Sequence, residues 1–131
     1  MSVKPSASAI TADLQRRVKQ RFGGREWCLL WEVGDGAGFR NDGWADALAV
    51  CIWPSKGLNI IGMELKASRQ DWLKELDKPE KNATWQAQCD EWYVVAPESI
   101  VVLAEIPAAW GLLVPKGADE LRIAKRCERE K

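Results

Sequence analysis

Two apolar runs that flank a short turn near the middle of the chain most constrain how it can fold. The first run covers residues 44 to 53, and the second covers residues 58 to 65. Between them, Pro54 has a fixed φ and Gly57 can adopt a left-handed conformation, so residues 54 to 57 have the composition of a tight turn. The pattern predicts a β-hairpin that folds the second run back along the first.

Charged residues interrupt the second run at alternating positions. On a strand, Glu64 and Lys66 point to one face, whereas Met63 and Leu65 point to the other. The first run carries one acid, Asp46. Folding the chain at the turn brings Asp46 level with residues 64 to 66.

The register of the hairpin decides whether Asp46 lies on the same face as Glu64 and Lys66, because a slip of one residue exchanges the two faces. If Trp53 pairs with Leu58, Asp46 lies opposite Leu65 and on the wrong side. If Trp53 pairs with Gly57, or if Gly62 forms a bulge, Asp46 joins the face of the two charged residues. Glycine inside a strand often marks a bulge, so we favour this second geometry.

Composition excludes several kinds of chemistry. The 131-residue chain contains no histidine, which rules out histidine triads, histidine bases and histidine metal ligands. Its four cysteines show no zinc or redox spacing, and its start shows no apolar signal segment, so we expect free thiols in a reducing cytoplasm. No run is long enough to span a membrane. Carboxylate and lysine chemistry around a hard cation such as Mg²⁺ remains.

The charges balance overall but are unevenly distributed. Residues 1 to 30 hold six basic against two acidic side chains, residues 120 to 131 hold five against three, and the middle holds eight against fourteen. An acidic centre suits a cation site, and basic ends can hold phosphates beside it. A nucleic-acid binder is usually more basic overall, which argues against tight nonspecific binding.

The order of the predicted elements indicates one α/β domain. We expect a poorly ordered tail over residues 1 to 9 and a single domain over residues 10 to 131. The domain would begin with an amphipathic helix over 11 to 22 and a strand over 27 to 33, ahead of the hairpin. Helices from 68 and from 79 to 90 follow it, then strands over 92 to 96 and 111 to 114 and an edge strand over 121 to 124. This is an α/β sandwich around a mixed sheet.

Several residues outside the hairpin are candidates for phosphate contacts. Arg16, Arg17 and Arg21 lie on the polar face of the first helix, where the alternative is a solvated surface. Ser68, Arg69 and Lys81 follow the hairpin near helix ends; here the alternatives are helix capping by Ser68 and simple exposure of the other two.

Eight tryptophans are many for this length, and unpaired bases can stack on exposed indoles. We expect Trp53, Trp72, Trp85 and Trp92 to be buried, and Trp44 and Trp110 to be exposed.

An aspartate on one strand of a hairpin, followed by Glu-x-Lys on the next strand and then a helix, resembles the PD-(D/E)XK nuclease superfamily. Asp46, Glu64 and Lys66 match its motif, and Glu32 matches the upstream glutamate that many members add; Ala45 replaces the usual proline. The stretches 62–72, 89–97 and 110–113 also look like small standalone members encoded in phage and bacterial genomes. The likeness covers roughly residues 27 to 115.

The resemblance implies a restriction-endonuclease-like αβββαβ core and Mg²⁺-dependent hydrolysis of DNA, with Mn²⁺ as a substitute ion. It implies that Asp46, Glu64, the carbonyl of Leu65 and Glu32 bind the ion, and that Lys66 positions water or offsets charge on the phosphorane. DNA is the expected partner, a homodimer is plausible by analogy, and neither an organic cofactor nor a membrane is expected. The alternatives are a catalytically inactive nucleic-acid-binding module, a protein-interaction module, or a surface ion pair between Glu64 and Lys66.

Overall fold

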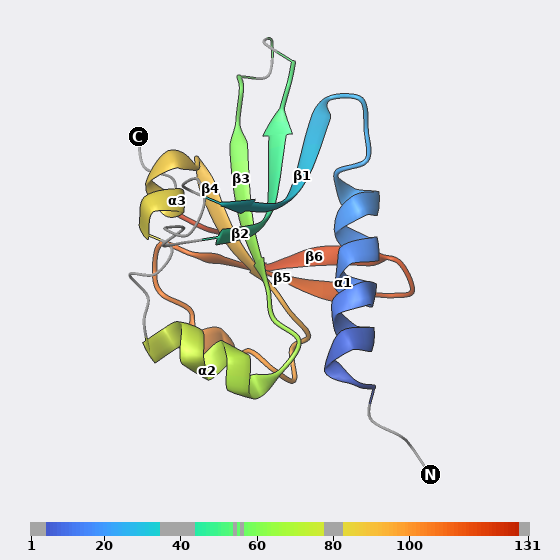
Figure 1. Ribbon diagram of the computed structural model, residues 1–131, viewed down its shortest axis with the longest axis vertical. Helices are drawn as coiled ribbons and strands as arrows, with labels where there is room; N and C mark the ends of the chain where they lie inside the picture. Colours follow the sequence, from blue (N-terminus) through green and yellow to red (C-terminus); the bar gives the residue numbers. More distant parts are fainter. Residues whose placement is uncertain (1–4, 35–43, 54, 56, 78–82, 129–131) are drawn as a thin grey trace.

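The computed structural model describes residues 5–34, 44–53, 55, 57–77 and 83–128, in one mixed α/β fold (Figure 1). Its elements are, in chain order, α1 (Ala7–Arg21), β1 (Trp27–Gly34), β2 (Trp44–Cys51), β3 (Ile60–Leu65), α2 (Arg69–Asp77), α3 (Ala83–Gln88), β4 (Glu91–Val95), a 3₁₀ turn (Leu103–Glu105), β5 (Gly111–Lys116) and β6 (Glu120–Lys125). The predicted order of helices and strands is confirmed. No helix among the described residues is both long and apolar enough to cross a membrane.

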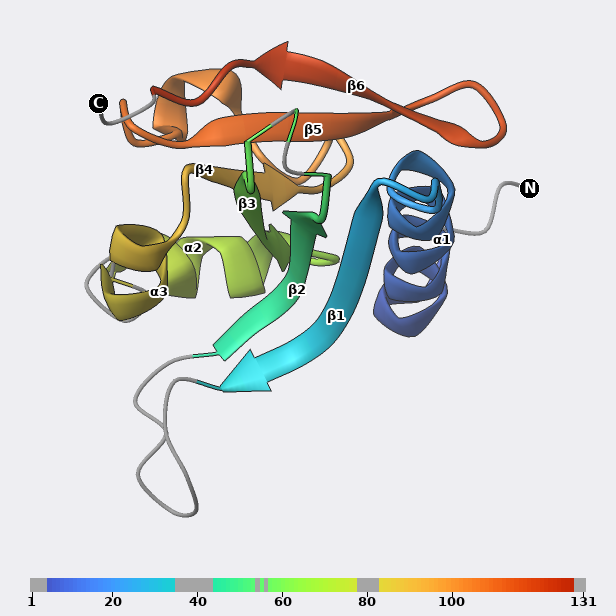
Figure 2. The ribbon, with the colours of Figure 1, turned by 90° about the horizontal axis from the view of Figure 1, so that it is seen from above.

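The six strands form one mixed sheet in which they lie in chain order. β1, β2 and β3 are antiparallel, β3, β4 and β5 are parallel, and β6 returns antiparallel to β5 as the predicted edge strand. Parallel neighbours need crossover connections, which α2 and α3 supply between β3 and β4. Figure 2 shows α1 on one side of the sheet and α2 and α3 on the other. The predicted sandwich with a mixed sheet is therefore observed.

Helix α1 covers one face of the sheet with its apolar stripe. Leu14, Val18 and Phe22 are buried there against Met63, Tyr93 and other residues of the sheet. The side chain of Ser6 accepts a hydrogen bond from the Ala9 amide and caps the helix. The cap makes the helix begin at Ala7, so residues 7 to 9, which we predicted to belong to a poorly ordered tail, are helical.

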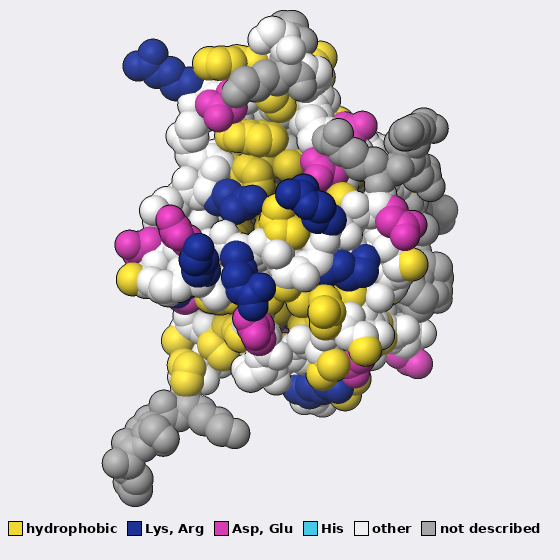
Figure 3. Space-filling model, turned by 180° about the vertical axis from the view of Figure 1, so that it is seen from behind, with side chains coloured by type: hydrophobic (Ala, Val, Ile, Leu, Met, Phe, Trp, Pro, Cys, Tyr) yellow, Lys and Arg dark blue, Asp and Glu magenta, His cyan; other side chains and the backbone are white. Residues whose placement is uncertain are grey.

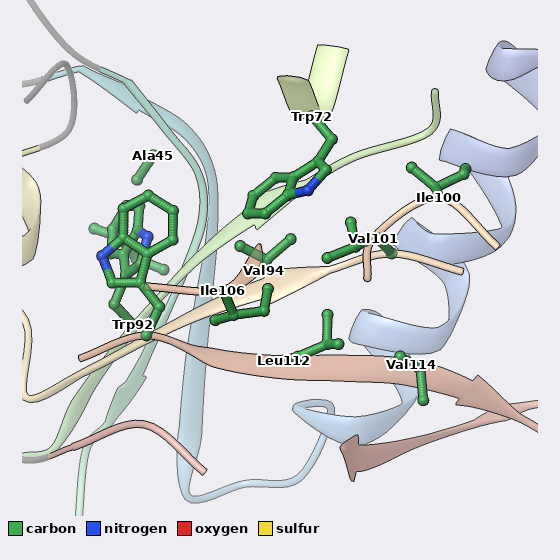
Figure 4. Packing of buried hydrophobic residues seen from close by; sticks show 12 residues of the cluster. Ala45, Trp72, Trp92, Val94, Ile100, Val101, Ile106, Leu112 and Val114 are labelled. Atoms are coloured by element: carbon green, nitrogen blue, oxygen red, sulfur yellow. The ribbon is translucent and has the colours of Figure 1, made fainter. Parts of the chain in front are cut away.

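The opposite face packs on α2 and on the segment between β4 and β5. Trp72 is fully buried among Val94, Ile106 and Leu112 (Figure 4), and its ring meets Trp110 edge-on at 6.4 Å between centroids. Aromatic pairs in this arrangement add to the free energy gained by burying their apolar area. This second core fixes where α2 lies relative to the end of β3.

The tryptophan predictions are confirmed in part. Trp72 and Trp92 are buried, as expected. Trp110, expected to be exposed, is 4% exposed because it fills the second core, whereas Trp53, expected to be buried, is 43% exposed beyond the end of β2. The side chains of Trp44 and Trp85 lie outside the described residues.

Candidate functional site

The register of the hairpin sets Asp46 beside Glu64. β2 and β3 pair with Ala47 opposite Met63 and Leu48 opposite Gly62, so one further step places Asp46 opposite Glu64. The Leu65 amide donates a 2.8 Å hydrogen bond to Asp46 Oδ2. This is the register that follows from pairing Trp53 with Gly57, one of the two ways in which we expected the acids to share a face.

The other way, a bulge at Gly62, is wrong, because the ladder runs through this residue without a shift. Gly62 has a packing role instead. A Cβ atom built there would lie 2.4 Å from the ring of Trp92 and 2.8 Å from Cys89 Sγ. The strand can therefore carry only glycine at this position without displacing the indole.

Lys66 extends from the end of β3 toward two carboxylates. Its backbone amide donates to the Val95 carbonyl at 3.0 Å, which ties this residue to β4. Its Nζ atom lies 3.7 Å from Glu64 Oε2 and 3.8 Å from Glu75 Oε1. Since the Lys66 side chain is only 12% exposed, this is a largely buried ion-pair cluster and differs from the surface ion pair considered as an alternative.

Glu75 is an acid that our sequence reasoning missed. It lies on α2 and is 3% exposed, and it occupies the same helix face as Trp72, three residues earlier. Leu73, which directly follows Trp72, points outward and is 46% exposed. A period of 3.6 residues that starts at Trp72 reaches residues 75 and 76, so the spacing did contain the signal.

The electrostatics of the cluster are dominated by Glu64. Burial, together with the negative charges of Asp46 and Glu75, raises the pKa of Glu64 from the ordinary value of 4.5 to about 9. Lys66 acts in the opposite direction but does not outweigh them, and a hydrogen bond from Glu64 to Asp46 favours the protonated form further. In the protein alone, Glu64 therefore holds a proton at neutral pH.

Glu32 lies near Asp46, on the outer strand β1. The two residues line one pocket of about 170 Å³, together with Thr11, Gln15, Trp31 and Leu65. Glu32 has a φ of 51°, a left-handed conformation that is uncommon for a residue with a side chain. Such backbone strain costs of the order of 1–3 kcal/mol and is concentrated at functional sites.

The donor set suits a cation that keeps much of its water. Among the residues that the structure describes, no three Asp, Glu or Cys side chains converge closely enough to hold a metal ion by themselves. Asp46 and Glu64 are two neighbouring carboxylates, and Mg²⁺ typically binds one or two carboxylates plus water and substrate phosphates. A cation that replaces the proton of Glu64 would also remove the repulsion between the acids.

The arginines of α1 are engaged with the β5–β6 hairpin. Arg17 is buried, which contradicts the alternative of a solvated surface for this residue, and it donates to Asp13 and to the carbonyls of residues 116, 117 and 120. Because these partners use its guanidinium, Arg17 serves to dock α1 rather than to contact phosphate. Arg16 pairs with Asp13 and Asp119 but stays exposed, as does Arg21, and their phosphate contacts remain predictions.

The three phosphate-contact candidates after the hairpin, Ser68, Arg69 and Lys81, have different outcomes. Ser68 caps α2, since its hydroxyl accepts from the amide of Asp71 at 3.1 Å, as the alternative reading of the sequence proposed. Arg69 donates to both carboxylate oxygens of Glu105 at 2.6 Å and to the Ile100 carbonyl at 2.9 Å. This salt bridge, with the hydrogen bond from Trp72, lowers the pKa of Glu105 to about 2. Lys81 lies outside the described residues.

Comparison with known proteins supports the fold without naming a function. No protein-family model matches the chain, and no curated protein matches it. Among solved structures, the chain is similar to the SPO1766 protein of unknown function from Silicibacter pomeroyi, with a TM-score of 0.63 and 21% sequence identity. The similarity covers 100% of this chain and 77% of that one, so the same arrangement of helices and strands occurs in that protein.

Proposed function

We propose that this protein is a Mg²⁺-dependent phosphodiesterase that cleaves DNA, with a site of the PD-(D/E)XK type on a restriction-endonuclease-like core. The observation that carries the proposal is the convergence of Asp46, Glu64 and Lys66 at the end of one hairpin. A buried cluster with more acids than bases is unfavourable alone and becomes favourable when a cation binds. The proposed setting is phage or bacterial DNA processing, repair or junction resolution.

Each side chain has a distinct part in the proposed reaction. Asp46 and Glu64 would hold the ion, and the Leu65 carbonyl and Glu32 would serve as further ligands. When bound, Mg²⁺ supplies Lewis-acid polarisation of the scissile phosphate and a water of lowered pKa. Lys66 places an ammonium group beside the reacting phosphate, where it orients the attacking water or offsets the charge that develops in the transition state.

The test measures ion binding and cleavage separately. Calorimetric titration with Mg²⁺ or Mn²⁺ should show binding to the wild type that Asp46→Asn abolishes, while Asp77→Asn, which removes an exposed acid at the end of α2, should bind normally. Supercoiled, linear and single-stranded DNA should be cleaved only with the divalent ion. Cleavage by Lys66→Ala at the wild-type rate would remove Lys66 from the mechanism.

A second candidate function is binding without catalysis. The net charge is zero, and Asp and Glu side chains lie among the Lys and Arg side chains on the face shown in Figure 3. Beyond β2, Ile52, Trp53 and Leu58 are exposed apolar residues that suit a protein contact, including a second copy of the chain. Two results together would favour this candidate: a titration in which no divalent ion binds, and sizing with and without DNA that shows a complex with DNA or a dimer of the chain.

A further inference from the structure

Glu75 is a charged residue in a place where an apolar one would pack. It lies on the buried stripe of α2, beside Trp72 and the partly buried Leu76. Burying a carboxylate is costly unless the group is paired. In the part of the chain that the structure describes, this cluster brings three acids, Asp46, Glu64 and Glu75, close to the ammonium group of Lys66. The negative charge of Glu75 therefore adds to the repulsion in the cluster while binding the ammonium.

The contact between Glu75 and Lys66 joins two separate elements. Glu64 approaches the ammonium from β3, and Glu75 approaches it from α2, at 3.7 and 3.8 Å. A lysine side chain is a flexible stem with a compact charge, and one carboxylate leaves it several orientations. Two carboxyl groups on separate rigid elements restrict the ammonium to the space between them. The capping of α2 by Ser68 and the burial of Trp72 fix the position of Glu75 in turn.

We propose that Glu75 is a positioning residue that holds the ammonium group of Lys66 against the Asp46–Glu64 pair from the side of α2. The inference rests on the function proposed above and names a residue of that same site. Glu75 does not touch DNA, because its side chain is only 2% exposed. Glu75 affects the reaction only by positioning the ammonium group of Lys66. Its neutral isostere, glutamine, lacks the negative charge that attracts this ammonium.

The first test compares steady-state cleavage by Glu75→Gln and Asp77→Asn, the latter a neutralised acid at the exposed end of the same helix. Misplacing a catalytic group by about 1 Å can cost about a hundredfold in rate. We expect Glu75→Gln to lower kcat by about ten- to a hundredfold with KM for DNA unchanged, and Asp77→Asn to match the wild type. In a Lys66→Ala background, Glu75→Gln should lower the rate no further. Equal kcat for Glu75→Gln and the wild type would overturn the inference.

The second test does not depend on catalysis. In the metal-free protein, the NMR order parameter of the Lys66 Cε methylene reports how firmly the side chain is held. It should fall in Glu75→Gln and stay unchanged in Asp77→Asn, and an unchanged value in both would overturn the inference. If Glu75→Gln does not fold, Glu75→Asp keeps the charge, shortens its reach and should also lower the order parameter. A wild type that cleaves nothing with Mg²⁺ contradicts the proposed function, and the order parameter then decides this inference alone.

Discussion

The protonated state of Glu64 predicts an unusual dependence of stability on pH. A carboxyl group whose pKa is higher in the folded than in the unfolded state holds a proton that the unfolded chain has lost. Between the ordinary value of 4.5 and the folded value of about 9, unfolding therefore releases a proton at Glu64. The contribution of Glu64 to stability is fully present below pH 4.5 and decreases as the pH rises toward 9.

The size of the effect follows from this linkage. One proton released on unfolding lowers the free energy of unfolding by about 1.4 kcal/mol per pH unit, or about 3 kcal/mol between pH 5.5 and 7.5. The chain has no histidine, so no group with an ordinary pKa near 6.5 obscures this interval. Burial raises the pKa of Cys89 to about 12, and that thiol affects stability only at more alkaline pH.

Urea unfolding in buffers free of divalent ions measures this slope. With a typical denaturant dependence of about 1–3 kcal/mol per molar urea, the wild-type midpoint should fall by about 1–3 M over the interval. Glu64→Gln mimics the protonated acid and should show a flat profile. Glu105→Gln is the matched control: the pKa of Glu105 is lowered to about 2, so its stabilisation is lost only as the pH falls below about 4.5, and the slope should remain.

Parallel profiles for the wild type and Glu64→Gln would refute the reasoning, because they would mean that Glu64 is ionised in the folded protein at these pH values. Mg²⁺ should flatten the wild-type profile and leave that of Glu64→Gln unchanged, since a cation that replaces the proton removes the linkage.

Three further changes have expected outcomes. Lys66→Met removes the cation that faces Glu64 and Glu75 and should lower the free energy of unfolding by about 3–5 kcal/mol at neutral pH, measured by urea unfolding; a change below 1 kcal/mol would mean that the three groups are not coupled. Ser68→Ala removes the cap of α2 and should cost about 1 kcal/mol in the same assay, whereas Ser68→Asp should retain most of the stability. Gly111→Ala places a Cβ atom 2.2 Å from the ring of Tyr93 and should cost about 1–3 kcal/mol or more in thermal unfolding, with a wild-type melting temperature contradicting the packing described here.

The hairpin was predictable because its information is local. Alternation over residues 58 to 66 fixes which side chains share a face, and the turn limits the register to two choices. The arrangement of Asp46, Glu64 and Lys66 follows from these facts together with the observed ladder. Choosing between the two registers needed the structure, because Gly62 has the same sequence signature in a bulge as in a close contact with an indole.

The remaining differences arise from contacts between elements far apart in the sequence. Trp110 is buried because α2 places Trp72 against it, and Arg17 is buried because α1 docks on a turn about a hundred residues later. Glu75 joins the site because the second core sets the rotation of α2. Residue spacing along the chain predicts none of these long-range contacts. Only the helical spacing from Trp72 indicated that Glu75 lies on the buried side of α2.

Two local departures from favourable structure occur within this small region. The cluster keeps Glu64 beside two other acids in a buried position, and Glu32, on the pocket that it shares with Asp46, has a left-handed backbone. Apolar residues of similar volume at positions 64, 66 and 75 would pack without the electrostatic cost, and glycine at 32 would relieve the strain. Unfavourable features that coincide in space are expected where a ligand offsets them. A divalent cation at Asp46 and Glu64 would offset the electrostatic cost of the cluster. For this reason we propose the functional site here rather than in the larger pockets of the surface.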